Sequence, residues 1–461
     1  MTTEIAVLNR LGIALATDSA VTIGGGLNDK VFDSADKLFE LSPIHPVAVM
    51  INGNMDCLGV PWELIIKDFR EAEGNKPRLT IKVWMEDFLL FVSHYPHLGD
   101  KQSDAIVAGK VNGLADYIKT EIYKGLLSGV RNRERPDIKN ENEFRAAIKK
   151  YFLELTEELT QTYESLGKAN SLASVDADMI CASYSTISDD FITRQFAPHA
   201  ISSEEIDAFK SCCASMLVAA ETSEYTTGIV IAGYGTEGIF PAIESVEVEG
   251  RIVNILKYSV VNSYSVEDAE SSGQVVSYAQ TDVIERLLGG ADPIFVSKTA
   301  SFIREAVIEA GAALESAFRP QRMSRKNIET RLDMIEQIGA AYEDKYKSET
   351  AKKLNKEFTA AFDEMIALMP KQELVNLAEA LVSITAVERK ASADLGTVGG
   401  PIDVALITKH EGFVWIKRKQ HFDPNLNPRY FWRRYGKNIT GGGFGAGASW
   451  AERSGEGEAT D

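Results

Sequence analysis

Residues 2–19 read TTEIAVLNRLGIALATDS, and this stretch decides the fold. Residues 3–8 alternate in the manner of a strand, Gly12 marks a turn, and residues 13–17 form a second apolar segment. The second segment ends at Asp18. The chain is therefore predicted to open with two strands joined by a short turn.

Thr2 combines two chemical groups that hydrolysis of an amide needs. Removal of Met1 would leave the Thr2 hydroxyl and a free α-amine on one residue. An alcohol is a weak nucleophile until a base takes its proton, and an α-amine with a pKa of about 7.7–8.0 is suited to that task. Thr2 is thus a candidate nucleophile that carries its own base. The competing interpretation is that Thr2 merely begins an edge strand, where β-branched residues are common.

Three further motifs follow in order. Residues 37–41 read KLFEL, residues 47–51 form an apolar strand, and Asn52-Gly53-Asn54 precedes a helix expected from about residue 58. This series resembles proteasome β-subunits and the bacterial HslV-type peptidases, which are N-terminal-nucleophile hydrolases. The resemblance implies an α+β fold, a four-layer αββα sandwich of two antiparallel sheets between helices, here with two helical insertions.

The resemblance also implies a role for each residue of an active centre. Thr2 would attack the carbonyl carbon, and Lys37 would lower the pKa of its hydroxyl and amine. Asp18 would hold Lys37, and the backbone N–H of Gly53 would face the oxyanion. A surface ion pair and a simple strand-to-helix turn are the alternatives for these positions. Lys30 is a rival lysine that lacks the apolar setting of residues 37–41.

Later parts of the chain supply the remaining positions. Asp394 and Thr397 match an aspartate and a hydroxyl that orient the terminal amine and a water, although a glycine-closed helix end also explains this segment. The family's mid-chain serine has no clear counterpart, and Thr281 is the residue we assign to it. The matching specificity pocket is apolar and predicts an uncharged side chain before the scissile bond; it comprises Val21, Ala35, Ile51 and Met55.

The chain of 461 residues is longer than family subunits, so inserted segments are expected. Helical spacing predicts helices at 105–127, 141–166 and 203–220, the last with a capping box of Ser202 and Glu205. A period of two residues predicts strands at 227–235, 239–248 and 252–261, with Gly250 between the last two. A helix at 281–288, helical periodicity over 295–369, a helix at 373–389 and strands at 404–408 and 412–417 follow. The predicted organisation is a core at 1–98, 224–290 and 370–418, helical insertions at 99–223 and 291–369, and a basic-aromatic, then glycine-rich tail at 419–461.

Composition narrows the classes of function. Asp and Glu number 67 against 49 Lys and Arg, a net charge of −18, which disfavours binding to nucleic acid or to an anionic membrane. No apolar run reaches the ~18 residues of a membrane span, and the start lacks a secretory pattern. A cytoplasmic protein is predicted.

Three local patterns are typical of other functions, and each has a simpler explanation. Residues 233–238 fit G-x-G-x-x-G, but the sequence after them predicts a hairpin and not the helix that a dinucleotide site needs. His94 and His97 are separated by Pro96, which keeps them off one helical face. The arginines and aromatic residues of 429–437 have a composition that can bind single-stranded nucleic acid, although docking onto an acidic protein surface fits the net charge better.

The sequence therefore predicts a threonine-type peptidase that cleaves peptide bonds through an acyl-enzyme, without metal or organic cofactor. The alternatives are an amidohydrolase acting on a small-molecule amide and a catalytically inert, proteasome-like assembly subunit. The expected partners are a peptide or protein substrate and further copies of the chain in a homo-oligomer. An ATP-dependent unfoldase is a further possible partner.

Overall fold

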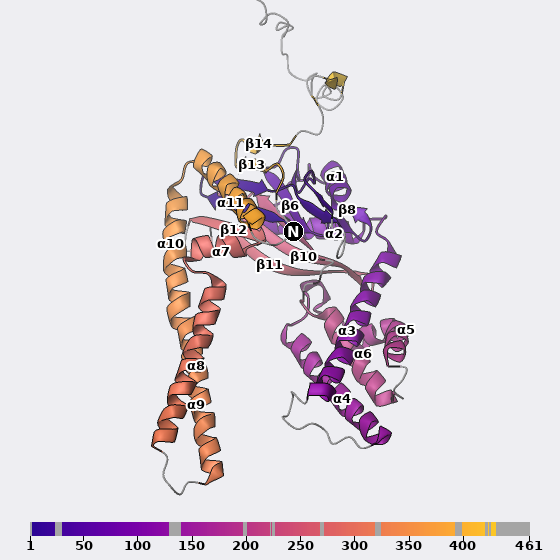
Figure 1. Cartoon of the computed structure of the whole chain (residues 1–461). Helices are drawn as coiled ribbons and strands as arrows, with labels where there is room; N and C mark the ends of the chain where they lie inside the picture. Colours follow the sequence, from indigo (N-terminus) through magenta and orange to yellow (C-terminus); the bar gives the residue numbers. More distant parts are fainter. Residues whose placement is uncertain are drawn as a thin grey trace, which may run out of the picture. The chain divides into compact units, whose positions relative to one another are not determined.

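Two antiparallel sheets organise the protein, as a computed structural model shows (Figure 1). The structure describes residues 2–23, 30–128, 140–196, 201–221, 223, 226–267, 272–318, 324–391, 399–419, 423 and 426–429. Met1–Arg418 form one compact unit, and Lys419–Asp461 form a second. The fold of the first unit is α+β, as predicted.

The first sheet has five strands, all antiparallel to their neighbours. In spatial order they are β12 (Gly273–Ala279), β1 (Thr3–Asn9), β2 (Gly12–Thr17), β13 (Asp403–Thr408) and β14 (Gly412–Lys417). The strand that follows Thr2 is therefore an inner strand, and the edge-strand interpretation of Thr2 is wrong.

The second sheet is also five-stranded and antiparallel. Its order is β11 (Ile255–Ser265), β10 (Ala242–Ile252), β9 (Thr227–Gly233), β6 (Val47–Gly53) and β5 (Leu38–Glu40). Two small hairpins pair β3 (Val21–Ile23) with β4 (Lys30–Phe32) and β7 (Asp56–Cys57) with β8 (Val60–Pro61).

The hairpin between β10 and β11 turns later than predicted. Val253 and Asn254 have φ values of 48° and 62°, which suits a two-residue turn between right-twisted strands. Gly250 lies inside β10, directly after a β-bulge at which the register with β11 shifts between Val248 and Gly250. Both strands therefore begin three residues and end four residues after the predicted positions.

The first helix also begins later than predicted. The sequence pattern favours a helix from about residue 58, whereas α1 is Trp62–Ala72. Leu58 and Gly59 have φ values of 51° and 84°, which closes the β7–β8 hairpin and excludes a right-handed helix there. Pro61 then precedes the first helical residue.

Helices cover both sheets. On the second sheet, α1 and α2 (Ile81–Ser93) share a core with strand residues such as Val49 and Ile229. On the first sheet, α7 (Asp282–Gly289), α10 (Lys352–Leu368) and α11 (Lys371–Ala391) share a core with Ile5 and Val7. A third core combines residues of the two sheets, including Leu8 of β1 and Met50 of β6.

Four helices between residues 100 and 218 share a separate hydrophobic core, which Ile252 of β10 joins. These helices are α3 (Asp100–Ser128), α4 (Glu141–Ser165), α5 (Ala177–Gln195) and α6 (Ser203–Val218). The predicted capping box is confirmed, since the Glu205 carboxylate accepts the backbone N–H of Ser202 at 2.9 Å. The sequence did not predict α5, because its many Ser, Thr and Ile residues are weak helix formers.

A second helical region precedes α11. Helices α8 (Pro293–Ala317) and α9 (Arg325–Lys345) pack against each other (Figure 1), and a π-helical turn, Tyr346–Ala351, leads from α9 into α10. Helical periodicity over residues 295–369 predicted these elements. None of the described helices combines the length and apolar character that a bilayer span demands.

Candidate active site

Thr2 is held at the start of β1 and is 5% exposed. Its carbonyl oxygen accepts the backbone N–H of Gln280 at 3.2 Å, so β12 fixes the main chain there. Thr281, which follows Gln280, is the residue before α7, and its carbonyl accepts the N–H of Glu285 at 2.8 Å. The backbone therefore brings Thr281 to the neighbourhood of Thr2.

Lys37 and Asp18 form an ion pair at 2.7 Å in which both residues are completely buried. The Lys37 ammonium also donates to the Ala20 carbonyl at 2.5 Å. One Asp18 oxygen accepts the N–H of Thr3 at 3.2 Å, and the other accepts those of Ala20 and Gly399 at 3.3 and 3.1 Å. Ionised groups need such partners to lie inside a protein. This network places the pair one peptide unit from Thr2.

Gly53 ends β6 with a φ of 77° and is exposed. A Cβ at this position would lie 2.4 Å from the Thr226 carbonyl oxygen, so no other residue fits this backbone. The Asn52 amide donates to the Glu4 carboxylate at 3.0 Å, which ties the end of β6 to the start of β1. The structure thus brings Gly53 toward the end of the chain that carries Thr2.

Glu4 belongs to this site, although the sequence pattern did not indicate it. It is fully buried, and burial raises the pKa of its carboxyl group to about 8 against the opposing effects of Asn52 and Lys37. Its second oxygen has no hydrogen-bond partner among the described residues, and the same holds for the hydroxyl of Thr17, which lies opposite Glu4 on β2. The sequence feature that could have indicated its role is a glutamate among the mainly apolar residues of the strand TEIAVLN.

The predicted specificity residues occupy two different environments. Val21 and Ala35 are half-buried near the β3–β4 hairpin. Ile51 is fully buried in the core beneath α1 and α2, and Met55 packs against the same core. Asp394 and Thr397 lie outside the described residues, so only Gly399, which bonds Asp18, represents that late segment at the site.

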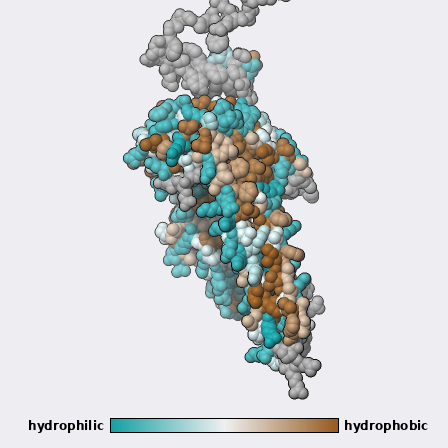
Figure 2. Space-filling model, turned by 90° about the vertical axis from the view of Figure 1, so that its left-hand side faces the viewer, coloured by the Kyte–Doolittle hydropathy of each residue, from teal (hydrophilic) through white to brown (hydrophobic). Residues whose placement is uncertain are grey.

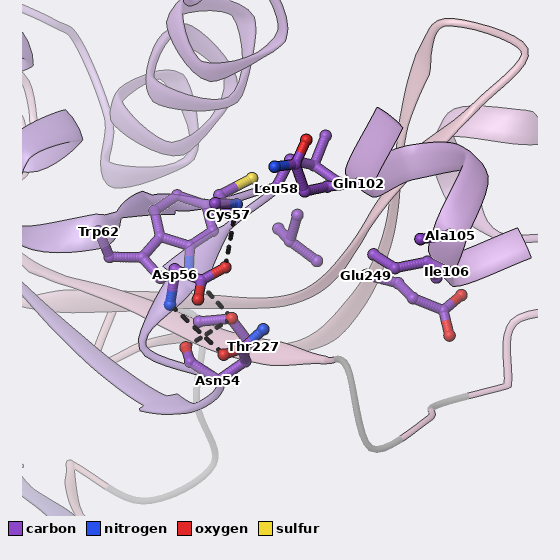
Figure 3. Close-up of a pocket in the computed structure, with 12 residues that line it drawn as sticks. Asn54, Asp56, Cys57, Leu58, Trp62, Gln102, Ala105, Ile106, Thr227 and Glu249 are labelled. Carbon is purple, nitrogen blue, oxygen red and sulfur yellow. Dashed lines mark hydrogen bonds between the residues drawn. The ribbon is translucent and has the colours of Figure 1, made fainter. Parts of the chain in front are cut away.

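A cavity of about 470 Å³ opens beyond Gly53 (Figure 3). Asn54 and Thr227, which flank Gly53 in sequence and across the sheet, form one side with Asp56 and Trp62. The Trp62 indole donates to the Thr227 hydroxyl at 2.9 Å, and this hydroxyl donates to the Asn54 carbonyl at 2.8 Å. None of the four predicted specificity residues lines this cavity, so the sequence pattern did not predict it.

A second buried ion cluster lies at the far side of the cavity. Glu249, which lines the cavity, pairs with Lys110 at 2.7 Å and with Lys257 at 2.9 Å. The pKa of Lys257 is lowered to about 8 by burial and by the charge of Lys110, against the attraction of Glu249. The two lysines lower the pKa of Glu249, although burial opposes them. One carboxylate here serves two buried cations.

The described residues contain no group of three or more His, Cys, Asp or Glu side chains arranged to hold a metal ion. Among the described residues, hydrogen bonds link Asp18 with Lys37, and Glu4 with the end of β6, to the segment that begins at Thr2.

Comparisons with known proteins correct the family assignment. No protein-family model matches the chain, and no curated protein is similar to it. Among solved structures, the Anbu (ancestral beta-subunit) from Yersinia bercovieri is 9% identical with a TM-score of 0.27, over 96% of this chain and 100% of that chain. A likeness this weak carries no argument.

The prediction that the chain belongs with proteasome β-subunits and HslV-type peptidases was therefore wrong. The prediction was based on short motifs around residues 2, 18, 37 and 53. Such local features, a strand followed by a turn or a buried lysine, are not confined to one family. The chemistry of this chain has to be inferred from its own geometry.

Proposed function

We propose that this protein is a threonine-type hydrolase that cleaves amide bonds in peptides, with Thr2 as its nucleophile after removal of Met1. The observation that carries the proposal is the buried Lys37–Asp18 pair, which is hydrogen-bonded to the backbone of Thr3. A buried cation beside a hydroxyl and an amine lowers the pKa of both and favours the developing alkoxide.

In the proposed reaction, the Thr2 hydroxyl oxygen attacks the carbonyl carbon while the α-amine of Thr2 takes the hydroxyl proton. The backbone N–H of Gly53 faces the oxyanion, and loss of such a donor typically costs ~3 kcal/mol of transition-state stabilisation. The protonated amine returns the proton to the leaving amine as the C–N bond breaks. Water then attacks the ester on Thr2, releases the acid and regenerates the hydroxyl.

We also infer that the two sheets lie face to face between helical layers, in a four-layer αββα order. Support comes from the core shared by Leu8 of β1 and Met50 of β6, and from the separate helical cores on the two sheets. In that order the start of β1 and the end of β6 belong to neighbouring layers, as the Glu4–Asn52 hydrogen bond requires.

The experiment is intact-mass and peptide-level mass spectrometry of the protein after treatment with an epoxyketone, which reacts with a hydroxyl and an amine on the same residue. We expect protein that lacks Met1 and carries one adduct on Thr2. Thr2→Ala is the matched control and should remain unlabelled. Active protein that retains Met1, or labelling that survives Thr2→Ala, would contradict the proposal.

A small-molecule amide is the second candidate substrate, and the cavity beyond Gly53 favours it, because about 470 Å³ lies within the range of small-ligand sites. Casein and fluorogenic peptides distinguish the two candidates. Cleavage of peptides supports the first, whereas an epoxyketone adduct on Thr2 without peptide cleavage supports the second. A folded protein that lacks Met1 and takes up no epoxyketone would instead be an inert subunit.

A further inference from the structure

Helices α8 and α9 use one side of each helix to pack against each other. The seam is tight: a Cβ on Gly311 would lie 2.6 Å from Ile335, and one on Gly339 would lie 3.0 Å from Ile308. Arg304 of α8 adds ion pairs with Glu336 and Glu343 of α9 at 3.4 and 3.6 Å. The faces that α8 and α9 turn toward each other are therefore closely packed.

Large apolar side chains remain on the outside of the pair. Phe295 and Phe302 of α8 are 65% and 69% exposed, and they lie seven residues apart on one face. Phe302 is two residues, or roughly 200°, from Arg304, which pairs with α9, so it points away from α9. On α9 the exposed apolar residues recur every fourth position and so form a stripe; they are Met334, Ile338 and Tyr342.

Figure 2 shows hydrophobic side chains gathered along this helical region on the face turned to the viewer. Scattered exposed apolar residues are ordinary, but a contiguous patch marks an interaction site. A pair of helices buries the faces that the two helices turn to each other but leaves a second apolar face exposed, whereas a bundle of four helices can bury it.

We propose that α8 and α9 bind the same two helices of a second copy of this chain, in antiparallel orientation, to form a four-helix bundle. This inference goes beyond the proposed hydrolysis and does not depend on it. In a symmetric pair the same patch serves both copies, so one apolar surface is sufficient.

The charge pattern identifies the occupant as a second copy. Residues 293–304 of α8 carry a net charge of +2 and residues 305–317 carry −3, while residues 325–334 of α9 carry +1 and residues 335–345 carry −2. The net charge of each helix thus changes from positive near its N-terminus to negative near its C-terminus. These charges have the same signs as the ends of the helix macrodipole, so they do not stabilise the isolated helix. Antiparallel copies place each positive half beside a negative half, as Arg304 and Glu336 already do within one chain.

Other occupants fit this surface less well. An anionic membrane or a nucleic acid requires a basic surface, and both helices together carry a net negative charge. The apolar stripes also lack the dense arginine and lysine content of such sites.

The test is the molar mass of the full chain, measured by light scattering and sedimentation across a concentration series. We expect an oligomer that Phe302→Glu or Ile338→Glu weakens by about 100-fold or more in Kd, because a buried apolar anchor is replaced by a charge. Leu90→Glu is the matched control, since Leu90 is 59% exposed on α2, outside the proposed interface. It should leave the molar mass unchanged.

Charge reversal tests the orientation. Lys298→Glu and Glu309→Lys should each weaken self-association, and mixing the two variants should restore a mixed oligomer, because antiparallel α8 helices bring these positions together. A wild-type chain that stays monomeric at high concentration would overturn the proposal. So would folded Phe302→Glu and Ile338→Glu variants, checked by circular dichroism, that associate as tightly as wild type.

Discussion

The two buried ion clusters of this protein differ in how their carboxylates are satisfied. Asp18 has one ammonium partner, Lys37, and three backbone N–H donors. Glu249 stands between two ammonium groups, Lys110 and Lys257. The first cluster is a neutral pair fixed by the main chain, whereas the second carries one excess positive charge inside the protein.

Under the proposed function, the Lys37–Asp18 pair takes part in catalysis, whereas the Glu249 cluster stabilises the fold. Asp18 keeps three backbone N–H donors when Lys37 is removed, so under the proposed function we expect Lys37 to matter more for turnover than for the fold. Glu249 has no such independence, because two buried cations rely on one carboxylate. Two substitutions test this contrast directly, and two more compare the clusters with a buried acid and an exposed ion pair.

Lys37→Ala should have the largest effect, a loss of about 10³-fold or more in kcat, since the charge that favours the alkoxide is removed. The fold should persist, because Asp18 keeps its bonds to Thr3, Ala20 and Gly399. Steady-state hydrolysis of a fluorogenic peptide and circular dichroism measure the two expectations. Unchanged turnover would remove Lys37 from the mechanism.

Glu249→Gln should lower the free energy of unfolding by about 3–5 kcal/mol, because Lys110 and Lys257 would face each other without a counter-ion. Urea denaturation measures this change. Glu247→Gln, two residues away on β10 and half-buried, is the control and should change stability little. Equal effects in the two variants would show that Glu249 is not the centre of the cluster.

Glu4→Gln should remove a pH dependence of stability. The pKa of Glu4 is about 8 in the folded protein against 4.5 without its surroundings, so the folded state keeps a proton that the unfolded state has lost. The stability of the wild type therefore falls as the pH rises from 4.5 to about 8. The variant should be more stable than wild type at pH 8, by about 2–4 kcal/mol, and similar at pH 4.5. Parallel curves of unfolding free energy against pH for the two proteins would refute this.

Glu141→Gln should have the smallest effect. Glu141 pairs with Arg145 at 2.7 Å on the surface of α4, where water and salt screen the attraction. Its thermal midpoint should equal that of wild type within error. A drop as large as that of Glu249→Gln would mean that burial is not what distinguishes the ion pairs.

Much of the sheet framework could be predicted from sequence pattern. The turn at Gly12 and the apolar segments around it predicted β1 and β2, and the structure places Asp18, directly after β2, beside the backbone of Thr3. Local spacing succeeds here because adjacent antiparallel strands need only a short turn. The same logic failed at residue 58, where two residues with positive φ interrupt a helical pattern.

The polar interior was beyond sequence reasoning. Every residue of β1 is buried, because this strand is covered on both faces, and alternation then does not tell which side of the strand faces water. Alternation alone therefore did not indicate that Glu4 is buried. The cluster of Lys110, Glu249 and Lys257 joins α3, β10 and β11, and no spacing along the chain relates them.

Because the Thr226 carbonyl closely approaches Gly53, the residue at position 53 of a related sequence indicates whether this backbone arrangement is present. A Cβ atom added to Gly53 would lie 2.4 Å from the Thr226 carbonyl oxygen, which leaves no room for any side chain. In a homologue that carries alanine or a larger residue there, the backbone where β6 pairs with β9 must follow a different path. Such a protein will have lost this arrangement around Thr2, even where its threonine, aspartate and lysine are all retained.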